Sequence, residues 1–145
     1  MFGIIVGTHG QFAPGIVQSC EMIFGKRDKL KAVTLMPGEG PDDVVARYEQ
    51  AIKELGTDKI LFFNDLMGGS PYNAACRLVA GNENYGIVAG VNLPALIAMS
   101  ALQDTDDGSM SIADIMEQAL AAVKDGAVVS SYESLNAATD DDDEL

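Results

Sequence analysis

The segment KILFFNDLMGGSPYN, residues 59–73, joins two kinds of predicted structure through a short loop. Its first six residues, 59–64, are mostly apolar and predict a buried strand. Ser70 and Pro71 predict the start of a helix, with a capping hydroxyl followed by proline at the first helical position. A strand that passes into a helix in this way is the building unit of a parallel sheet covered by helices.

The same unit recurs along the chain. Further strands are predicted at residues 3–7, 31–36 and 85–90, and a last, more polar strand at 127–132. Helical patterns of apolar residues begin near residues 12, 41, 92 and 111. This alternation predicts a single α/β domain whose sheet is doubly wound and mostly parallel, with helices on both faces.

The charge of the chain limits its partners. The 145 residues include 22 acidic and 9 basic side chains, which leaves a formal net charge of −13. Such a field disfavours binding to nucleic acid or to an anionic membrane, and it favours a basic protein as partner. Part of the charge lies in the block Asp140–Glu144. We expect the domain to occupy residues 1–133, followed by an acidic, disordered tail over residues 134–145.

Three further features concern the cellular location of the chain. Residues 84–103 carry no charged side chain, but Pro94 and interspersed polar residues favour a strand followed by a helix over a membrane span. Cys20 and Cys76 lie on apolar faces of predicted helices and are interpreted as buried thiols in a reducing environment. Because the first residues lack the basic region of a signal peptide, we expect a cytoplasmic location.

The chain contains one histidine, His9, and it directly follows the first predicted strand. Asp65 follows the third strand, and the turn 68–70 opens the helix after it. In a parallel sheet the carboxyl ends of the strands share one edge, where ligands bind. His9, Asp65 and the turn are therefore predicted to lie close together.

These groups suit phosphoryl chemistry. A carboxylate that accepts a hydrogen bond from one ring nitrogen leaves the other free as a nucleophile. Gly68, Gly69 and Ser70 precede a helix whose N-terminal N–H groups favour phosphate. Together they predict a phosphoryl relay site. Taken singly, Asp65 also fits an ordinary turn residue, and the turn an ordinary helix start.

Several other site types lack their required residues. The pattern G-x-x-x-x-G-K-[ST] of a P-loop is missing from the sequence, so a P-loop nucleotide site is excluded. With a single histidine and no conspicuous carboxylate cluster, no metal site is indicated. We therefore expect neither a metal nor another cofactor.

Three motifs together resemble a known family: THG at residues 8–10, GGSPYNAA at 68–75 and AGVNLP at 89–94. The chain is similar, up to about Leu102, to the IIA component of the mannose family of the bacterial sugar phosphotransferase system. The resemblance implies a sheet of order 2-1-3-4. It also implies a homodimer in which the last strand joins the partner's sheet antiparallel, as an edge strand exchanged between subunits.

The resemblance further implies how the site works. His9 would accept a phosphoryl group from the phosphocarrier HPr and pass it to a histidine of the IIB component. Asp65 would orient His9, and the turn 68–70 would hold the phosphoryl group. Thr8 and Met67 are predicted to belong to the partner surface, and a tryptophan stands at the position of Met67 in some relatives. The membrane would be reached only through the transporter complex.

Two alternative functions remain open at the level of sequence. A similar domain serves dihydroxyacetone kinase as its phosphotransfer subunit, and it would differ in the partner that takes the phosphoryl group. A non-catalytic regulatory module would bind an anion at the same turn without a phosphohistidine. The sequence does not reveal which sugar is transported, because the sugar does not contact this component.

Overall fold

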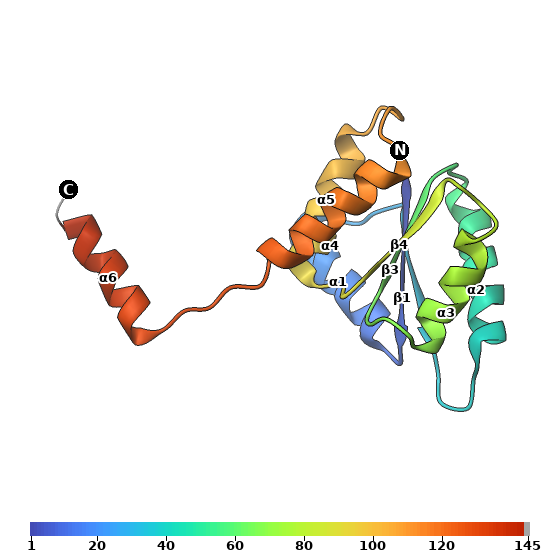
Figure 1. The fold of residues 1–145 in the computed structure, drawn as a ribbon, viewed down its shortest axis with the longest axis horizontal. Coiled ribbons are helices and arrows are strands. Elements are labelled where there is room, and N and C mark those ends of the chain that lie inside the picture. The colour runs from blue at the N-terminus through green and yellow to red at the C-terminus, as the bar shows by residue number, and fades with distance from the viewer. Residues whose placement is uncertain (144–145) are drawn as a thin grey trace.

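A sheet of four parallel strands lies at the centre of the protein in this computed structural model (Figure 1). The structure describes the backbone of residues 1–143 and the side chains through residue 137. The strands are β1 (Gly3–His9), β2 (Leu30–Leu35), β3 (Ile60–Asn64) and β4 (Tyr85–Ala89). Their order is β2-β1-β3-β4, and every neighbouring pair is parallel. The predicted α/β class and the sheet order 2-1-3-4 are therefore confirmed.

Helices cover both faces of this sheet (Figure 1). On one face lie α1 (Phe12–Phe24), α4 (Leu93–Thr105) and α5 (Ile112–Asp125). On the other face lie α2 (Pro41–Leu55) and α3 (Ser70–Val79). This arrangement is the doubly wound sheet that the alternation of strands and helices predicts.

Each face of the sheet has its own apolar cluster. In β3, Leu61 and Phe63 pack toward α1, α4 and α5, whereas Ile60 and Phe62 pack toward α2 and α3. All five residues of the strand are buried. Because both faces are covered, the strand reads as a continuous apolar run rather than as an alternating one.

Local signals in the sequence place most helix ends. Pro41 begins α2, and Gly56, with a left-handed backbone, ends it. Ser111 caps α5 through the predicted reciprocal contact with Asp114. The uncharged residues 84–103 form β4 and most of α4, as expected. Over residues 1–143, no helix has the length and apolar character needed to cross a membrane.

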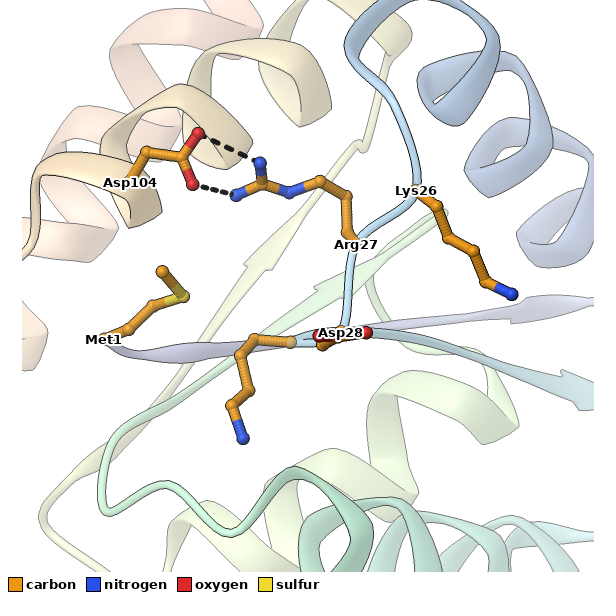
Figure 2. A pocket seen from close by; sticks show the side chains of 6 residues that line it. Met1, Lys26, Arg27, Asp28 and Asp104 are labelled. Atoms are coloured by element: carbon orange, nitrogen blue, oxygen red, sulfur yellow. Dashed lines mark hydrogen bonds and ion pairs between the residues drawn. The ribbon is translucent and has the colours of Figure 1, made fainter.

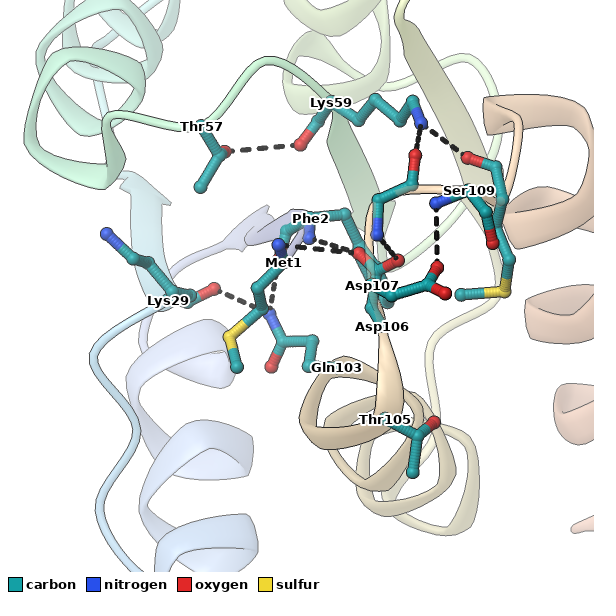
Figure 3. Close-up of polar contacts among 12 residues, drawn as sticks. Met1, Phe2, Lys29, Thr57, Lys59, Gln103, Thr105, Asp106, Asp107 and Ser109 are labelled. Atoms are coloured by element: carbon teal, nitrogen blue, oxygen red, sulfur yellow. Dashed lines mark hydrogen bonds and ion pairs between the residues drawn. The ribbon is translucent and has the colours of Figure 1, made fainter.

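The amino-terminal edge of the sheet is closed by polar contacts. Arg27, before β2, pairs with Asp104 at the end of α4, which lowers the pKa of that carboxyl (Figure 2). Beside it, Asp106 accepts the Phe2 N–H at 2.7 Å (Figure 3). Lys59 donates to two carbonyls of the loop 108–110, at 2.9 and 2.6 Å. These contacts hold loops together at the edge opposite His9.

The predicted last strand, Ala127–Tyr132, is wrong for this structure. Residues 127–131 are irregular and exposed, and Tyr132 begins a further helix, α6 (Tyr132–Asp143). Ser131 caps that helix: its hydroxyl accepts the Ser134 N–H at 3.1 Å, and its carbonyl accepts the Leu135 N–H at 3.0 Å. The local capping signal is thus satisfied, whereas strand formation depends on a neighbouring strand. Exchange of this segment between subunits stays a prediction.

The expected tail is only partly described. Helix α6 extends through residue 143 and so crosses the proposed boundary at residue 133 (Figure 1). The side chains of the acidic block Asp140–Glu144, expected to be disordered, lie outside the described residues. The division into a domain at 1–133 and a tail at 134–145 therefore stays a prediction.

Candidate functional site

The candidate site lies at the carboxyl edge of the sheet, where β1 and β3 end side by side. His9 is the last residue of β1, and Asp65 directly follows β3. The backbone turns away after His9 at Gly10, whose φ of +55° suits glycine. The His9 side chain is 46% exposed, whereas that of Asp65 is 12% exposed. The parallel sheet thus brings together two residues 56 positions apart in the chain.

Asp65 holds both the ring and the backbone of His9. Its Oδ2 lies 2.7 Å from His9 Nδ1 and accepts the His9 backbone N–H at 3.1 Å. Its Oδ1 accepts the Leu66 N–H at 3.0 Å. Because a carboxylate can only accept, Nδ1 carries the proton in this contact, and the lone pair of a neutral ring is on Nε2. The predicted role of Asp65 as the orienting carboxylate fits this geometry.

Gly69 lies directly against the imidazole. A Cβ atom added to Gly69 would lie 2.5 Å from His9 Cε1 and 3.0 Å from Nε2. Only glycine leaves room for the ring at this position. The preceding Gly68 has a φ of +89°, which turns the chain into α3. The ring therefore presents the side that carries Nε2 to the turn before α3.

The start of α3 differs by one residue from the sequence prediction. Gly69 is the N-cap, Ser70 the first helical residue and Pro71 the second. The Ser70 hydroxyl was expected to cap the helix, but within the described residues it makes no hydrogen bond. The close approach of the His9 ring explains why glycine occupies the cap position. Ser70 is consequently available to a ligand at the helix N-terminus.

The first turn of α3 is suited to an anion. Its earliest N–H groups have no carbonyl partner within the helix, and the helix dipole adds partial positive charge there. Backbone N–H groups and the Ser70 hydroxyl are hydrogen-bond donors at the N-terminus of this ten-residue helix, and the helix dipole adds to their attraction for an anion. A phosphoryl group is the ligand that this arrangement fits best.

The two residues predicted for the partner surface differ from each other. Thr8 is fully buried. Its hydroxyl accepts the Ala13 N–H at 2.7 Å, at the start of α1, and donates to the His9 carbonyl at 3.2 Å. Thr8 therefore has a capping role, which corrects its assignment to the partner surface. Met67 is 74% exposed beside the site, and its contact with a partner stays a prediction.

The loop that follows β2 lies on the side of His9 away from β3, and an ion pair holds it. Glu39, in the loop between β2 and α2, pairs with Arg47 of α2 and accepts the Met36 N–H at 2.8 Å. The hydrogen bond from Arg47 is the main reason that the pKa of Glu39 falls to about 2. Arg47 also donates to the Thr34 carbonyl at 2.8 Å. These contacts fix the loop that follows β2 next to the site.

Sequence reasoning missed two polar residues beneath the site, Tyr48 and Asn64. Both are fully buried, and their side chains are hydrogen-bonded to each other. The helical periodicity marks Tyr48 only as a core position, and the strand pattern includes Asn64 only as a strand end. No local sequence signal connects them, because α2 and β3 meet only in the folded chain.

No group of three or more His, Cys, Asp or Glu side chains in the described part of the chain is placed to hold a metal ion.

Several known proteins similar to this chain are components of the PTS system. A family model described as PTS system fructose IIA component matches residues 3–120. The fructose-specific EIIA component of the PTS system of Bacillus subtilis strain 168 is 37% identical over 105 residues, which are 72% of this chain and 72% of that protein. The mannose-specific EIIAB component of Escherichia coli strain K12 is 36% identical over 104 residues, or 71% of this chain. The match covers 32% of that longer protein, so the chain corresponds to about a third of it.

A solved structure has the same fold. The crystal structure of phosphotransferase system component EIIA from Streptococcus agalactiae superposes with a TM-score of 0.77 at 25% sequence identity. The match covers 89% of this chain and 97% of that one. Residues 3–120, which the family model matches, include His9, Asp65 and the turn before α3.

Proposed function

Because the chain belongs to the family of PTS fructose IIA components, we propose that it relays a phosphoryl group during sugar uptake. His9 accepts the group from phosphorylated HPr and passes it to the IIB component of the transporter. The observation that carries the proposal is the contact of Asp65 with Nδ1, which leaves Nε2 beside the N-terminus of α3. The protein acts in this account as a phosphotransferase with a phosphohistidine intermediate.

The transfer step needs only the groups at the site. The Nε2 lone pair of neutral His9 attacks the phosphorus of the donor phosphohistidine, and a new N–P bond forms. The N–P bond to the donor breaks, and its electron pair returns to the donor imidazole. His9 becomes a phosphorylated imidazolium, and Asp65 offsets its positive charge through the 2.7 Å contact at Nδ1. The donor ring carries a proton on its other nitrogen and so leaves as neutral imidazole, and no net proton transfer is required.

The turn before α3 stabilises the transferred group. Negative charge on the phosphoryl oxygens is met by the N–H groups of the first helical turn and by the Ser70 hydroxyl. These donors belong to a helix packed against the sheet and so need little rearrangement during transfer. The same donors serve acceptance from HPr and delivery to IIB, since the second step repeats the first in reverse order.

Partner proteins reach His9 across an exposed apolar rim. Leu66 and Met67, directly after Asp65, are 51% and 74% exposed. Phe12 at the start of α1 is 46% exposed. The net charge of −13 favours partners with a basic docking face. We assign this rim to HPr and IIB, and we place the protein in the cytoplasm, where both would meet it.

We further propose a homodimer formed by residues 127–132. Val128 and Val129 are 83% and 98% exposed in the single chain, and the adjacent Tyr132 is 87% exposed. β4 is an end strand of the sheet, and a cavity beside it is lined by apolar side chains that include Ile87 and Met116. Residues 127–132 of a second copy, paired with β4, would cover both the edge of this strand and the cavity beside it.

The test is incubation with phosphorylated HPr followed by intact-mass measurement. We expect the protein to gain one phosphoryl group that is lost in acid. The matched variant His9→Gln keeps a polar side chain of similar size and is expected to gain none. A phosphorylated His9→Gln protein would contradict the assignment of the site. Addition of IIB or of the dihydroxyacetone kinase subunits then identifies the acceptor by the loss of that mass.

A further inference from the structure

The hydroxyl of Tyr48 links three segments beneath the candidate site. It donates to the Pro71 carbonyl, in the first turn of α3, at 2.9 Å. It accepts a hydrogen bond from Asn64 Nδ2, at the end of β3, at 3.0 Å. The same amide nitrogen donates to the Gly7 carbonyl of β1 at 2.8 Å. One buried network thus joins β1, β3 and α3.

Each of these segments carries one part of the site. Gly7 lies two residues before His9, and Asn64 is followed directly by Asp65. Pro71 directly follows Ser70, the last residue of the proposed phosphoryl-binding turn 68–70. The network therefore contacts the backbone close to the nucleophile and to the phosphoryl donors, and it includes the residue before the orienting carboxylate.

The surroundings of Tyr48 are built around its hydroxyl. A Cβ atom on Gly7 would lie 1.9 Å from Tyr48 Oη, so glycine makes room for the hydroxyl against β1. Burial is the main reason that the pKa of Tyr48 lies above its usual range, which keeps the group protonated as a donor. The Tyr48 ring is fully buried and packs edge-on against Phe62 at a centroid distance of 5.0 Å.

The two ends of the Asn64 amide differ in their hydrogen bonding, since its Nδ2 donates twice within the network. Its Oδ1 is buried and has no hydrogen-bond partner in the described part of the chain. An unsatisfied buried acceptor is unfavourable, and an apolar side chain at this position would avoid it. The amide lies at the end of β3, next to β1, where both strands support the site.

We propose that Tyr48 is a positioning residue for phosphoryl transfer. Its hydroxyl holds the N-terminus of α3 at a fixed distance from the ends of β1 and β3, so that the donors of the turn 68–70 stay aligned with His9 Nε2. This inference rests on the proposed phosphoryl transfer. Displacement of donors by about 1 Å is enough to slow such a reaction strongly.

The test compares Tyr48→Phe with Tyr85→Phe in steady-state phosphorylation by phosphorylated HPr. Tyr48→Phe removes only the hydroxyl and keeps the ring contact. Tyr85 also packs edge-on against Phe62, but its hydroxyl has no hydrogen-bond partner among the described residues. We expect Tyr48→Phe to lower kcat about 10- to 100-fold with KM changed less than about twofold. Tyr85→Phe is expected to keep the wild-type kcat.

A second readout does not depend on transfer. In NMR spectra of the unphosphorylated proteins, Tyr48→Phe is expected to shift the amide signals of Gly69 and Ser70, and Tyr85→Phe to leave them in place. Unchanged kcat and unchanged amide signals in Tyr48→Phe overturn the proposal, as does an equal loss of kcat in both variants. If the wild-type protein accepts no phosphoryl group, the proposed function fails, and the amide signals still report whether Tyr48 positions the turn.

Discussion

At the scale of single residues, the two ring nitrogens of His9 have different surroundings. Nδ1 contacts Asp65, whereas Nε2 faces the turn at Gly69. The sequence predicted the components of this arrangement, because His9, Asp65 and the turn all follow strands or open a helix at one sheet edge. It could not predict that Tyr48 lies beneath the site, since the hydrogen bonds of its hydroxyl join it to segments distant in the chain.

Replacement of Asp65 by alanine is expected to slow phosphoryl transfer about 10- to 1000-fold, because the imidazole loses its orienting partner and its countercharge. Stopped-flow or quenched transfer from phosphorylated HPr measures the rate. Asp58→Ala is the control, since it removes one exposed carboxylate just before β3, at the opposite edge of the sheet. A wild-type rate in Asp65→Ala would remove Asp65 from the mechanism.

Replacement of Gly69 by alanine tests the close contact with the ring. The added methyl group would meet His9 Cε1 at 2.5 Å, so the imidazole or the turn must move. We expect transfer to fall by at least about 100-fold while the fold, measured by circular dichroism, is retained. Gly81→Ala, just after the other end of α3, meets only an ordinary contact at 3.7 Å and should transfer normally. Normal transfer by Gly69→Ala contradicts the geometry described here.

At the scale of elements, the strands and helices followed from sequence pattern where local signals and burial agree. β3 is buried on both faces, and its apolar run identifies it without knowledge of its neighbours. The last predicted strand has no such support. Its short alternation is compatible with a strand, but Ser131 caps α6 instead, and strand pairing requires a partner that the local sequence does not specify.

The loop between β2 and α2 should respond to acid through Glu39. Its pKa falls from an ordinary 4.5 to about 2 in the folded protein, mainly because of the hydrogen bond from Arg47. A lowered folded-state pKa means that the contact stabilises the fold above about pH 4.5 and that this contribution is lost as the pH falls toward 2. We expect the difference in unfolding free energy between wild type and Glu39→Gln to shrink across this window in chemical denaturation. A difference independent of pH would show that the ion pair does not act in this way.

At the scale of the whole molecule, the unusual feature is the segment that connects α5 to α6. Its Val128 and Val129 are 83% and 98% exposed, which places them among the most exposed large apolar side chains of the described residues. The single chain thus leaves both this segment and the outer edge of β4 without a neighbouring strand among the described residues. Association of two chains would explain both features at once.

Truncation tests this assembly. A chain that ends after Asp125 lacks the segment, and we expect it to sediment as a monomer or to aggregate through the uncovered edge of β4. A chain that ends after Ala138 keeps the segment and is expected to sediment as a dimer. Analytical ultracentrifugation over a range of concentrations distinguishes these species. A stable monomer for the full chain would refute the dimer and leave the phosphoryl transfer at His9 unaffected.

The most direct test of the central claim is NMR spectroscopy of the phosphorylated protein labelled with ¹⁵N in histidine. The chain contains one histidine, so its two ring nitrogens are the only labelled ring signals. After reaction with phosphorylated HPr, we predict that Nε2 shows coupling to phosphorus and that Nδ1 carries the proton directed to Asp65. Phosphorus coupled to Nδ1, or a ring that carries no phosphoryl group, would contradict the account.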